Sequence, residues 1–184
     1  MPRALIPLLA LIFAACGSTQ SASQFGEVPL ALPPQVSADE AGVYFATYRT
    51  YDEGEGVELV PSKEGDADFR ITDAPPSGCT VVMAIVPPDK LVLCVDEVIL
   101  QDDRAKVVAV VRALQRGYTQ AQKEPEEALS AITAQEPDAD RQALAAGLDE
   151  AAPAWTAGQP YFGAIERGPG RDSSVARDAN DERN

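Results

Sequence analysis

Two residue counts limit the chemistry that this chain can perform: its 184 residues include three cysteines and no histidine. Without histidine, the chain lacks the commonest general base, the commonest zinc ligand and any Ser-His-Asp or Cys-His arrangement. It also has no glycine-rich phosphate loop, no EF-hand loop and no Cys-x-x-Cys pair. Adjacent acids such as Asp102-Asp103 and Glu126-Glu127 point to different sides of a helix or complement its dipole. We therefore expect no enzymatic reaction, no cofactor and no metal site.

Cys16 follows a segment with the layout of an export signal. Residues 1–15 contain one basic residue, Arg3, then an apolar run, and they end in Ala14-Ala15. The run is shorter than the roughly 20 apolar residues that cross a bilayer, so we predict a lipoprotein signal peptide. Small residues before a cysteine let a peptidase bind the extended chain, and the thiol is a nucleophile for diacylglycerol. The pattern resembles a lipobox with Phe13 at an aliphatic position; the alternative is an N-terminal helix with a chance cysteine.

The acidic composition limits the expected partners. The formal net charge is -14, and removal of the leader with Arg3 would make it more negative. Nucleic-acid phosphates would be repelled, so nucleic acid is not an expected partner. No polybasic patch is expected either, so membrane attachment would come from the lipid on Cys16. We expect an exported protein, anchored by lipid to the extracytoplasmic face of the bacterial cell membrane.

The other two cysteines, Cys79 and Cys94, are a possible disulfide. An oxidising compartment permits them to pair. Closing a loop of about 15 residues would contribute roughly 3 kcal/mol in the chain-entropy model. The alternative is two reduced, buried cysteines, because Cys94 lies inside the apolar run 91–95. The sequence leaves both possibilities open.

The elements that would position these residues begin with short strands and one helix. Apolar runs predict strands at residues 28–32, 57–60, 67–72, 80–86 and 91–95. Ser37 and Glu40 have the spacing of a capping box. One face of the predicted helix after them is formed by Ala41, Tyr44, Phe45 and Tyr48. The last two strand runs are apolar without alternation, which suits strands covered on both faces.

The second half of the chain is predicted to be helical. Apolar residues recur at helical spacing from Val107 to Tyr118, before a second helix with Pro125 in its first turn. Asp138 is expected to cap a third helix, which ends at Pro153. Trp155, the only tryptophan, either lines a groove or anchors the last helix.

We expect an α/β fold, a single lobe in which a mixed, mostly parallel sheet has helices on both faces. Four segments are predicted in order: a signal peptide at 1–15, a lipidated cysteine and flexible tether at 16–27, the α/β domain at 28–165, and a tail at 166–184. The tether is rich in Ser, Gln and Ala, which is typical of a flexible linker. The tail is rich in Gly, Arg, Asp and Ser, and we expect it to be disordered.

The order of several fragments resembles one known family. The fragments are Val28–Leu32, Glu40–Ala46, Glu55–Pro61, Gly65–Thr72, Leu91–Val95, Gln101–Arg104, Val107–Tyr118, Lys123–Ala128 and Glu136–Asp140. They are similar to segments of ABC-transporter solute-binding proteins of the thiamine-pyrimidine-precursor and aliphatic-sulfonate branch, with Arg70 where a glycine is usual. The resemblance covers roughly residues 28–165. Members of the family have two lobes, whereas here Thr72 runs within a few residues into the return strand. The resemblance therefore implies one periplasmic-binding-protein-like lobe without the second.

The resemblance also implies which residues face a ligand. In the family these come from the loop into the first helix and the end of the third strand, which nominates Glu40, Ala41, Gly42, Tyr44, Thr72 and Asp73. Gly42 would permit close approach near a helix N-terminus, whose amides favour an anion. Tyr44 would stack on a heteroaromatic ring, and Asp73 would accept from an amine. The alternative is that Tyr44 packs in the core with Phe45 and Asp73 caps a turn.

Two functions are therefore expected. The first is the lipid-anchored, extracytoplasmic solute-binding component of an ABC transporter, with an ABC permease and a thiamine-precursor-like or sulfonate-like small molecule as partners. The second is a non-binding accessory or interaction lipoprotein, or an internally deleted copy of a solute-binding protein. Binding pockets normally bury most of a ligand's surface. A single lobe can bury most of a ligand's surface only if it dimerises, so the first function implies a possible homodimer.

Overall fold

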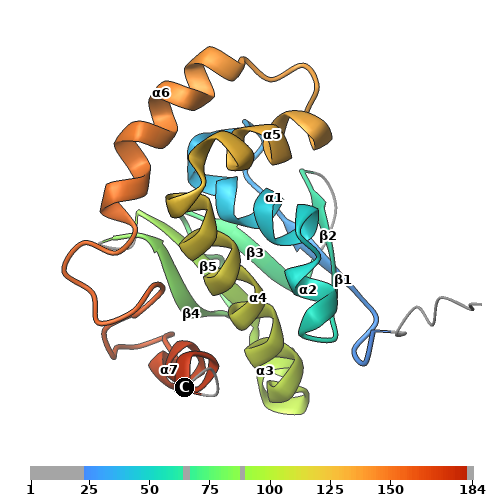
Figure 1. The fold of residues 1–184 in the computed structure, drawn as a ribbon. Coiled ribbons are helices and arrows are strands. Elements are labelled where there is room, and N and C mark those ends of the chain that lie inside the picture. The colour runs from blue at the N-terminus through green and yellow to red at the C-terminus, as the bar shows by residue number, and fades with distance from the viewer. Residues whose placement is uncertain (1–22, 64–66, 88–89, 182–184) are drawn as a thin grey trace, which may run out of the picture.

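A five-stranded sheet forms the centre of the molecule (Figure 1). The computed structural model describes residues 23–63, 67–87 and 90–181. The strand order is β2-β1-β3-β5-β4, with β1 at Glu27–Ala31, β2 at Glu58–Ser62, β3 at Phe69–Thr72, β4 at Cys79–Val86 and β5 at Leu91–Asp96. β1 is parallel to β2 and β3, whereas β5 is antiparallel to β3 and β4. The sheet is mixed, as expected, but the expectation that it is mostly parallel is wrong, because β4 and β5 form a hairpin.

The first helical segment begins at the predicted capping box, which is confirmed. The Ser37 amide donates to Glu40 Oε2 at 2.7 Å, and Ser37 Oγ accepts from the Asp39 amide at 3.2 Å. These bonds start the single turn η1 (Ala38–Glu40), which continues as α1 (Ala41–Tyr48) and then α2 (Tyr51–Gly54). The backbone groups at this helix start are therefore satisfied locally.

The three helices predicted for the second half are present as α4 at Arg104–Lys123, α5 at Pro125–Gln135 and α6 at Arg141–Ala151, which ends in the turn η2 at Ala152–Ala154. The short helix α3 at Glu97–Asp102, which precedes them, was not predicted. Pro125 lies in the first turn of α5, as expected. The cap of α6 is Asp140 rather than Asp138, because Asp140 Oδ1 accepts from the amides of Gln142 and Ala143. Asp138 lies too far from these amides along the chain to act as the cap.

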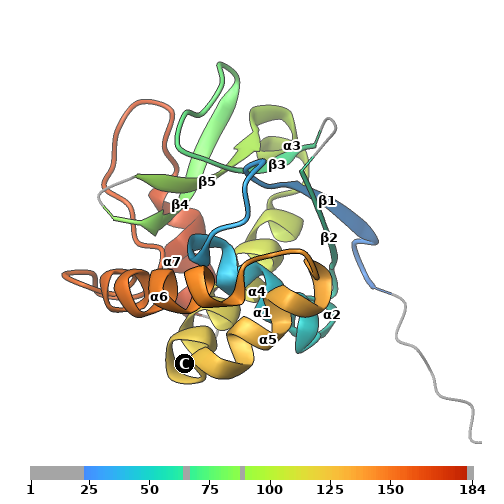
Figure 2. The ribbon, with the colours of Figure 1, turned by 90° about the horizontal axis from the view of Figure 1, so that it is seen from above.

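Helices cover one face of the sheet, so the expectation of helices on both faces is wrong. Figure 2 shows α1, α4, α5 and α7 on the same side of the strands. On β1, Val28 and Leu30 are buried against these helices while Glu27 and Pro29 are exposed. On β2, Val60 is 40% exposed. The alternation of these short strands is that of a sheet with one covered face.

The tail contains a packed helix, which corrects the expectation of disorder from residue 166. Before it, the Val81 amide donates to the Gly170 carbonyl and the Asp172 amide donates to the Val81 carbonyl, both at 2.9 Å. Helix α7 (Ser173–Asp181) then buries Val175, Ala176 and Ala179. The tail packs against the domain because these small apolar residues lie on one face of α7. The mostly polar composition of the tail does not reveal this apolar face.

Trp155 packs in the core and not along a groove. Its side chain is 1% exposed and meets Tyr118 edge-on with 5.0 Å between ring centroids. Tyr118 in turn stacks on Phe162, which comes after η2 in the chain. This aromatic cluster ties the segment after α6 to α4.

The predicted leader and its lipidation residue, Cys16, lie outside the described residues. The predicted tether at 16–27 is described only from residue 23, and its last residues join the fold. The Phe25 amide donates to the Gly56 carbonyl at 2.8 Å, and β1 begins at Glu27. In the three described ranges, no helix combines the length and apolar character that crossing a membrane requires.

Candidate functional site

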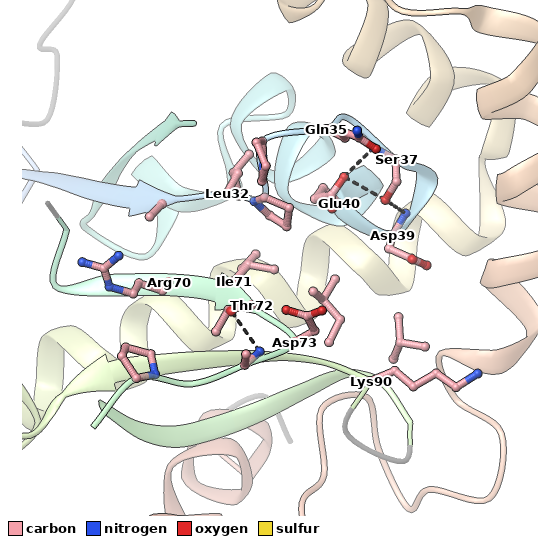
Figure 3. Close-up of a pocket in the computed structure, with 17 residues that line it drawn as sticks. Leu32, Gln35, Ser37, Asp39, Glu40, Arg70, Ile71, Thr72, Asp73 and Lys90 are labelled. Carbon is pink, nitrogen blue, oxygen red and sulfur yellow. Dashed lines mark hydrogen bonds between the residues drawn. The ribbon is translucent and has the colours of Figure 1, made fainter. Parts of the chain in front are cut away.

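A cavity of about 750 Å³ opens beside the carboxyl ends of β1 and β3 (Figure 3). We call it the strand-end cavity. Its walls come from four places: the loop after β1, the turn η1, the end of β3, and the ends of β4 and β5 where they meet. It is lined by residues 31–35, 37, 39, 40, 70–74, 76, 86, 90 and 91. Three of the six nominated ligand-binding residues, Glu40, Thr72 and Asp73, share this cavity.

Glu40 is the most buried acid of the strand-end cavity. Its side chain serves the capping box, where Ser37 Oγ donates to Glu40 Oε2 at 3.0 Å. Burial raises the pKa of Glu40 from 4.5 to about 7, although the two hydrogen bonds from Ser37 oppose the shift. Near neutral pH this carboxyl group therefore exchanges a proton with little bias toward either form.

Asp39 is adjacent to Glu40 on η1 and faces the same cavity. Burial raises its pKa, the Glu150 carboxylate raises it further, and the Lys90 ammonium lowers it. The Asp39 backbone is held in place, because the Tyr118 hydroxyl donates to its carbonyl at 2.7 Å. The position of η1 above the cavity therefore depends on the core residue Tyr118.

Thr72 and Asp73 end β3 at the floor of the cavity. Thr72 Oγ1 accepts from the Ala74 amide at 3.1 Å, so the turn is closed by Thr72 and not by Asp73. Asp73 is exposed, and Figure 3 shows its carboxylate directed toward the cavity between Thr72 and Lys90. Asp73 is thus placed to accept a hydrogen bond from a ligand.

The structure places the other three nominated residues in the packing of α1. Ala41 is fully buried and does not line the strand-end cavity. A Cβ on Gly42 would lie 2.2 Å from the Tyr118 ring, so this glycine permits close helix packing rather than approach of a ligand. Tyr44 is buried in the core with Phe45, and its hydroxyl donates to Glu136 Oε1 at 3.0 Å. Tyr44 does not line the strand-end cavity, so its ring is not placed to stack on a solute bound there.

The helix start beside the cavity does not offer the free amides expected for an anion. The Asp39 amide is bonded to Ser37 Oγ, and the Ser37 amide to Glu40. The Glu40 amide contacts the Ser37 carbonyl at 3.4 Å. Because the capping box partners these groups, positive charge in the cavity comes instead from side chains.

Those side chains are Arg70 and Lys90, at separate places on the wall (Figure 3). The guanidinium of Arg70 adds a cation to this wall. Neither Lys90 nor Asp39 is among the residues nominated from the sequence. The one available signal was that Asp39 directly precedes Glu40; Lys90 lies in a proline-rich turn with no motif.

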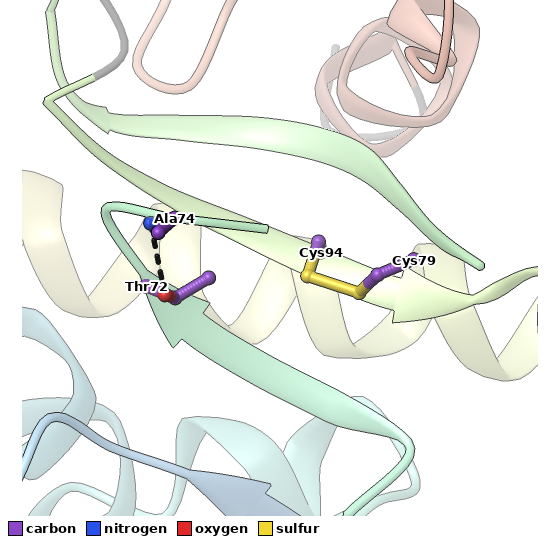
Figure 4. The surroundings of a disulfide bond; sticks show 4 residues. All are labelled: Thr72, Ala74, Cys79 and Cys94. Atoms are coloured by element: carbon purple, nitrogen blue, oxygen red, sulfur yellow. Dashed lines mark hydrogen bonds between the residues drawn. A yellow bond between two sulfur atoms is a disulfide. The ribbon is translucent and has the colours of Figure 1, made fainter. Parts of the chain in front are cut away.

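Cys79 and Cys94 are joined by a disulfide with 5.6 Å between their Cα atoms (Figure 4). It links the start of β4 to β5 on the face of the sheet away from the helices, where it packs with Val81 and Val92. The Cys79 amide donates to the Pro76 carbonyl at 3.2 Å, and Pro76 lines the strand-end cavity. The disulfide therefore anchors one end of the loop that forms part of the cavity wall.

Within the described residues, no group of three or more Cys, Asp or Glu side chains is arranged to hold a metal ion. The polar groups that line the strand-end cavity are hydrogen-bonding and charged side chains. No protein-family model matches the sequence, and no curated protein matches it. The family resemblance accordingly depends on the order of the sequence fragments.

Proposed function

We propose that the protein is the lipid-anchored, extracytoplasmic solute-binding component of an ABC transporter and that the strand-end cavity holds its solute. One observation carries the proposal. Glu40 and the pair Thr72-Asp73 were nominated from two separate segments by the family resemblance, and they line the same cavity. Crevices at the carboxyl ends of strands are common ligand sites in open α/β sheets.

The chemistry of the cavity suits a small, partly polar solute. Asp73 accepts from an amine, and Lys90 binds an anionic group. Apolar side chains between them, including Leu32, Ile71 and Leu91, offer surface to a flat ring. An amino-substituted heteroaromatic compound, such as a thiamine-precursor-like molecule, uses the acid and the apolar wall. A sulfonate-like molecule uses the lysine and the same wall.

The lipid attachment expected at Cys16 is consistent with a role in delivery. A chain held at the membrane surface meets a permease at a higher effective concentration than a freely diffusing one, without any additional contact. No reaction is proposed, because binding and release of an unchanged solute account for the groups in the cavity.

A thermal-shift screen tests the proposal with the purified chain from Gly17 onward. The compounds are aminopyrimidines, aliphatic sulfonates, polyamines and nucleobases. A ligand at about 100 times its dissociation constant should stabilise the fold by about 2.7 kcal/mol. Asp73→Asn should weaken an amine ligand and Lys90→Gln a sulfonate, whereas Asp102→Asn on exposed α3 should change neither. A cooperative melting transition that no compound shifts would reject the proposal.

One observation favours the accessory function as a second candidate. Only residues 73–78 lie between β3 and β4, so the chain passes from Thr72 into the next strand at the point where a second lobe would leave the sheet. The cavity is thus built from one lobe, which covers one side of a ligand. Sedimentation equilibrium separates the two candidates. A dimer that forms when ligand is added supports solute binding. A chain that stays monomeric and binds none of the compounds supports the accessory scaffold.

A further inference from the structure

A second cavity, of about 590 Å³, lies between the segment after η2 and the start of α7. We call it the tail cavity. It shares no lining residue with the strand-end cavity, so a ligand in the tail cavity is independent of the proposed function. Its polar groups are the side chains of Gln159, Tyr161, Arg167, Ser173 and Arg177, with Glu166 at the same wall.

The two arginines of the tail cavity, Arg167 and Arg177, are not fully neutralised by acidic side chains of the protein. Arg167 is exposed, and the structure shows no hydrogen bond or ion pair between it and a described residue. Arg177 Nε lies 3.8 Å from Asp178 Oδ1, at the limit of an ion pair. The other oxygen of Asp178 accepts from Arg104 Nη2 at 2.8 Å. Because Arg104 already engages Asp178, the guanidinium of Arg177 is only weakly neutralised.

A buried acceptor accompanies these cations. Gln159 Oε1 is buried and has no hydrogen-bond partner among the described residues. A buried acceptor without a donor costs about 1–3 kcal/mol, so a ligand that supplies an N–H or O–H group here gains that energy. A ligand that fits the tail cavity therefore carries a hydrogen-bond donor as well as an anionic group.

Electrostatics in the tail cavity favour a singly charged anion. Burial raises the pKa of the Tyr161 phenol, the Arg177 guanidinium lowers it, and Asp181 and Asp178 raise it again. The charge of Arg177 thus reaches the Tyr161 hydroxyl, but acidic groups border the same space. A phosphate dianion would meet more repulsion from Glu166, Asp178 and Asp181 than a carboxylate would.

From these groups we infer that the tail cavity binds a carboxylate whose neighbouring carbon carries an acylated amine, as in an N-acyl amino acid or the C-terminal residue of a peptide. The guanidiniums of Arg167 and Arg177 pair with the carboxylate. The amide N–H of the ligand donates to Gln159 Oε1, and its side chain lies against apolar residues such as Pro160, Ala164 and Ile165. The volume lies within the usual range of small-molecule sites, about 300–1,000 Å³.

Isothermal titration calorimetry with N-acetyl-L-alanine tests this inference. We expect saturable binding, at least about tenfold weaker binding of N-acetyl-L-alaninamide, which lacks the carboxylate, and weaker binding of inorganic phosphate. Acetyl-trialanine with a free carboxylate separates the two sources: tighter binding identifies a peptide C-terminus, and equal binding a free N-acyl amino acid. Equal heats from the acid and the amide, preferred binding of phosphate, or no saturation would each overturn it.

Variants locate the binding in the tail cavity. Arg167→Gln and Arg177→Gln should each weaken binding of N-acetyl-L-alanine about tenfold, and both positions are exposed, so the fold should survive. Arg141→Gln is the matched control, because Arg141 is an exposed arginine elsewhere that pairs with Glu126. Equal melting temperatures establish that all three variants are folded. Unchanged affinity in both tail-cavity variants would overturn the assignment.

Discussion

The two ends of the sheet are covered in different ways. At the β1–β2 end, helices cover one face and the other face is open, as the exposed side chains of Pro29 and Val60 show. At the β4–β5 end, both faces are buried, including Val81, Val92 and Cys94 on the face away from the helices. The second face there is covered by the disulfide and by Ile165 from the returning C-terminal segment.

This difference teaches that burial on both faces does not require helices on both faces. The continuous apolar runs of β4 and β5 correctly indicate strands with two covered faces. The cover on the second face is a disulfide and an irregular segment that also bonds along β4, through the Ala84 amide to the Gly163 carbonyl and through Val81. The strand-end cavity lies where the two arrangements meet, because its walls come from β1, β3, β4 and β5.

The largest effect is expected in the helical layer above the β1–β2 end. A Cβ on Gly117 would lie 2.1 Å from the Gly42 carbonyl oxygen and 2.8 Å from Ala46 Cβ. Gly117→Ala should therefore force α1 away from α4 and destabilise the protein by about 3 kcal/mol or more. Urea unfolding measures the change. The control is Gly54→Ala, where the nearest atom is 3.9 Å away; equal effects of the two variants would contradict this close contact.

At the β4–β5 end, the largest single contribution is expected from the disulfide. Replacing both cysteines, Cys79→Ala with Cys94→Ala, should lower the free energy of unfolding by about 3 kcal/mol, since the bond closes a loop with a sequence separation of 15. Thermal unfolding with and without dithiothreitol measures it. Reduction should leave the double variant unchanged. If reduction also left the thermal stability of the native chain unchanged, the disulfide would not contribute to the difference between the two ends of the sheet.

Glu40, at the junction of the two ends, is expected to make stability depend on pH. Its folded pKa of about 7 exceeds its ordinary value of 4.5. The folded chain therefore binds more protons than the unfolded chain between these values, and stability falls as pH rises through this window. The loss should be about 2 kcal/mol, allowing for residual solvent access.

Glu40→Gln keeps a side chain suited to the capping box and should flatten most of this slope, as urea unfolding from pH 4 to pH 8 would show. Some slope should remain, because burial also raises the pKa of Asp39 and Asp52. An identical slope in the variant would exclude Glu40 as its source.

The smallest of these effects tests whether the tail stabilises the β4–β5 end. Val175 of α7 is fully buried, so Val175→Ala should cost about 1.5 kcal/mol. Val98→Ala is the matched control, since Val98 is 62% exposed. Hydrogen exchange should also show protection of the Val81 and Asp172 amides, which bond between β4 and the tail. Equal costs in the two variants would mean that α7 adds nothing to this end.

Only part of the candidate site could be predicted from the sequence, and the reason is the rotation of α1. Glu40 closes the capping box and so stays at the cavity, on the first turn. Gly42 and Tyr44 come within four residues of it but face Tyr118 and Glu136, because the turn of the helix carries them to other sides. Lys90 reaches the cavity from a turn distant in the chain, which no local pattern indicates.

The sequence by itself determined the local elements: the strands, the capping box at Ser37 and Glu40, the long α4, and Pro125 at the start of α5. Each depends on residues a few positions apart, so neighbouring side chains suffice to specify it. The tertiary structure decided which sheet faces are covered, that Cys79 pairs with Cys94, and that the tail forms α7. These outcomes depend on segments that meet only after folding, such as β4 and the chain around Arg171, and their contact energies are absent from any local pattern.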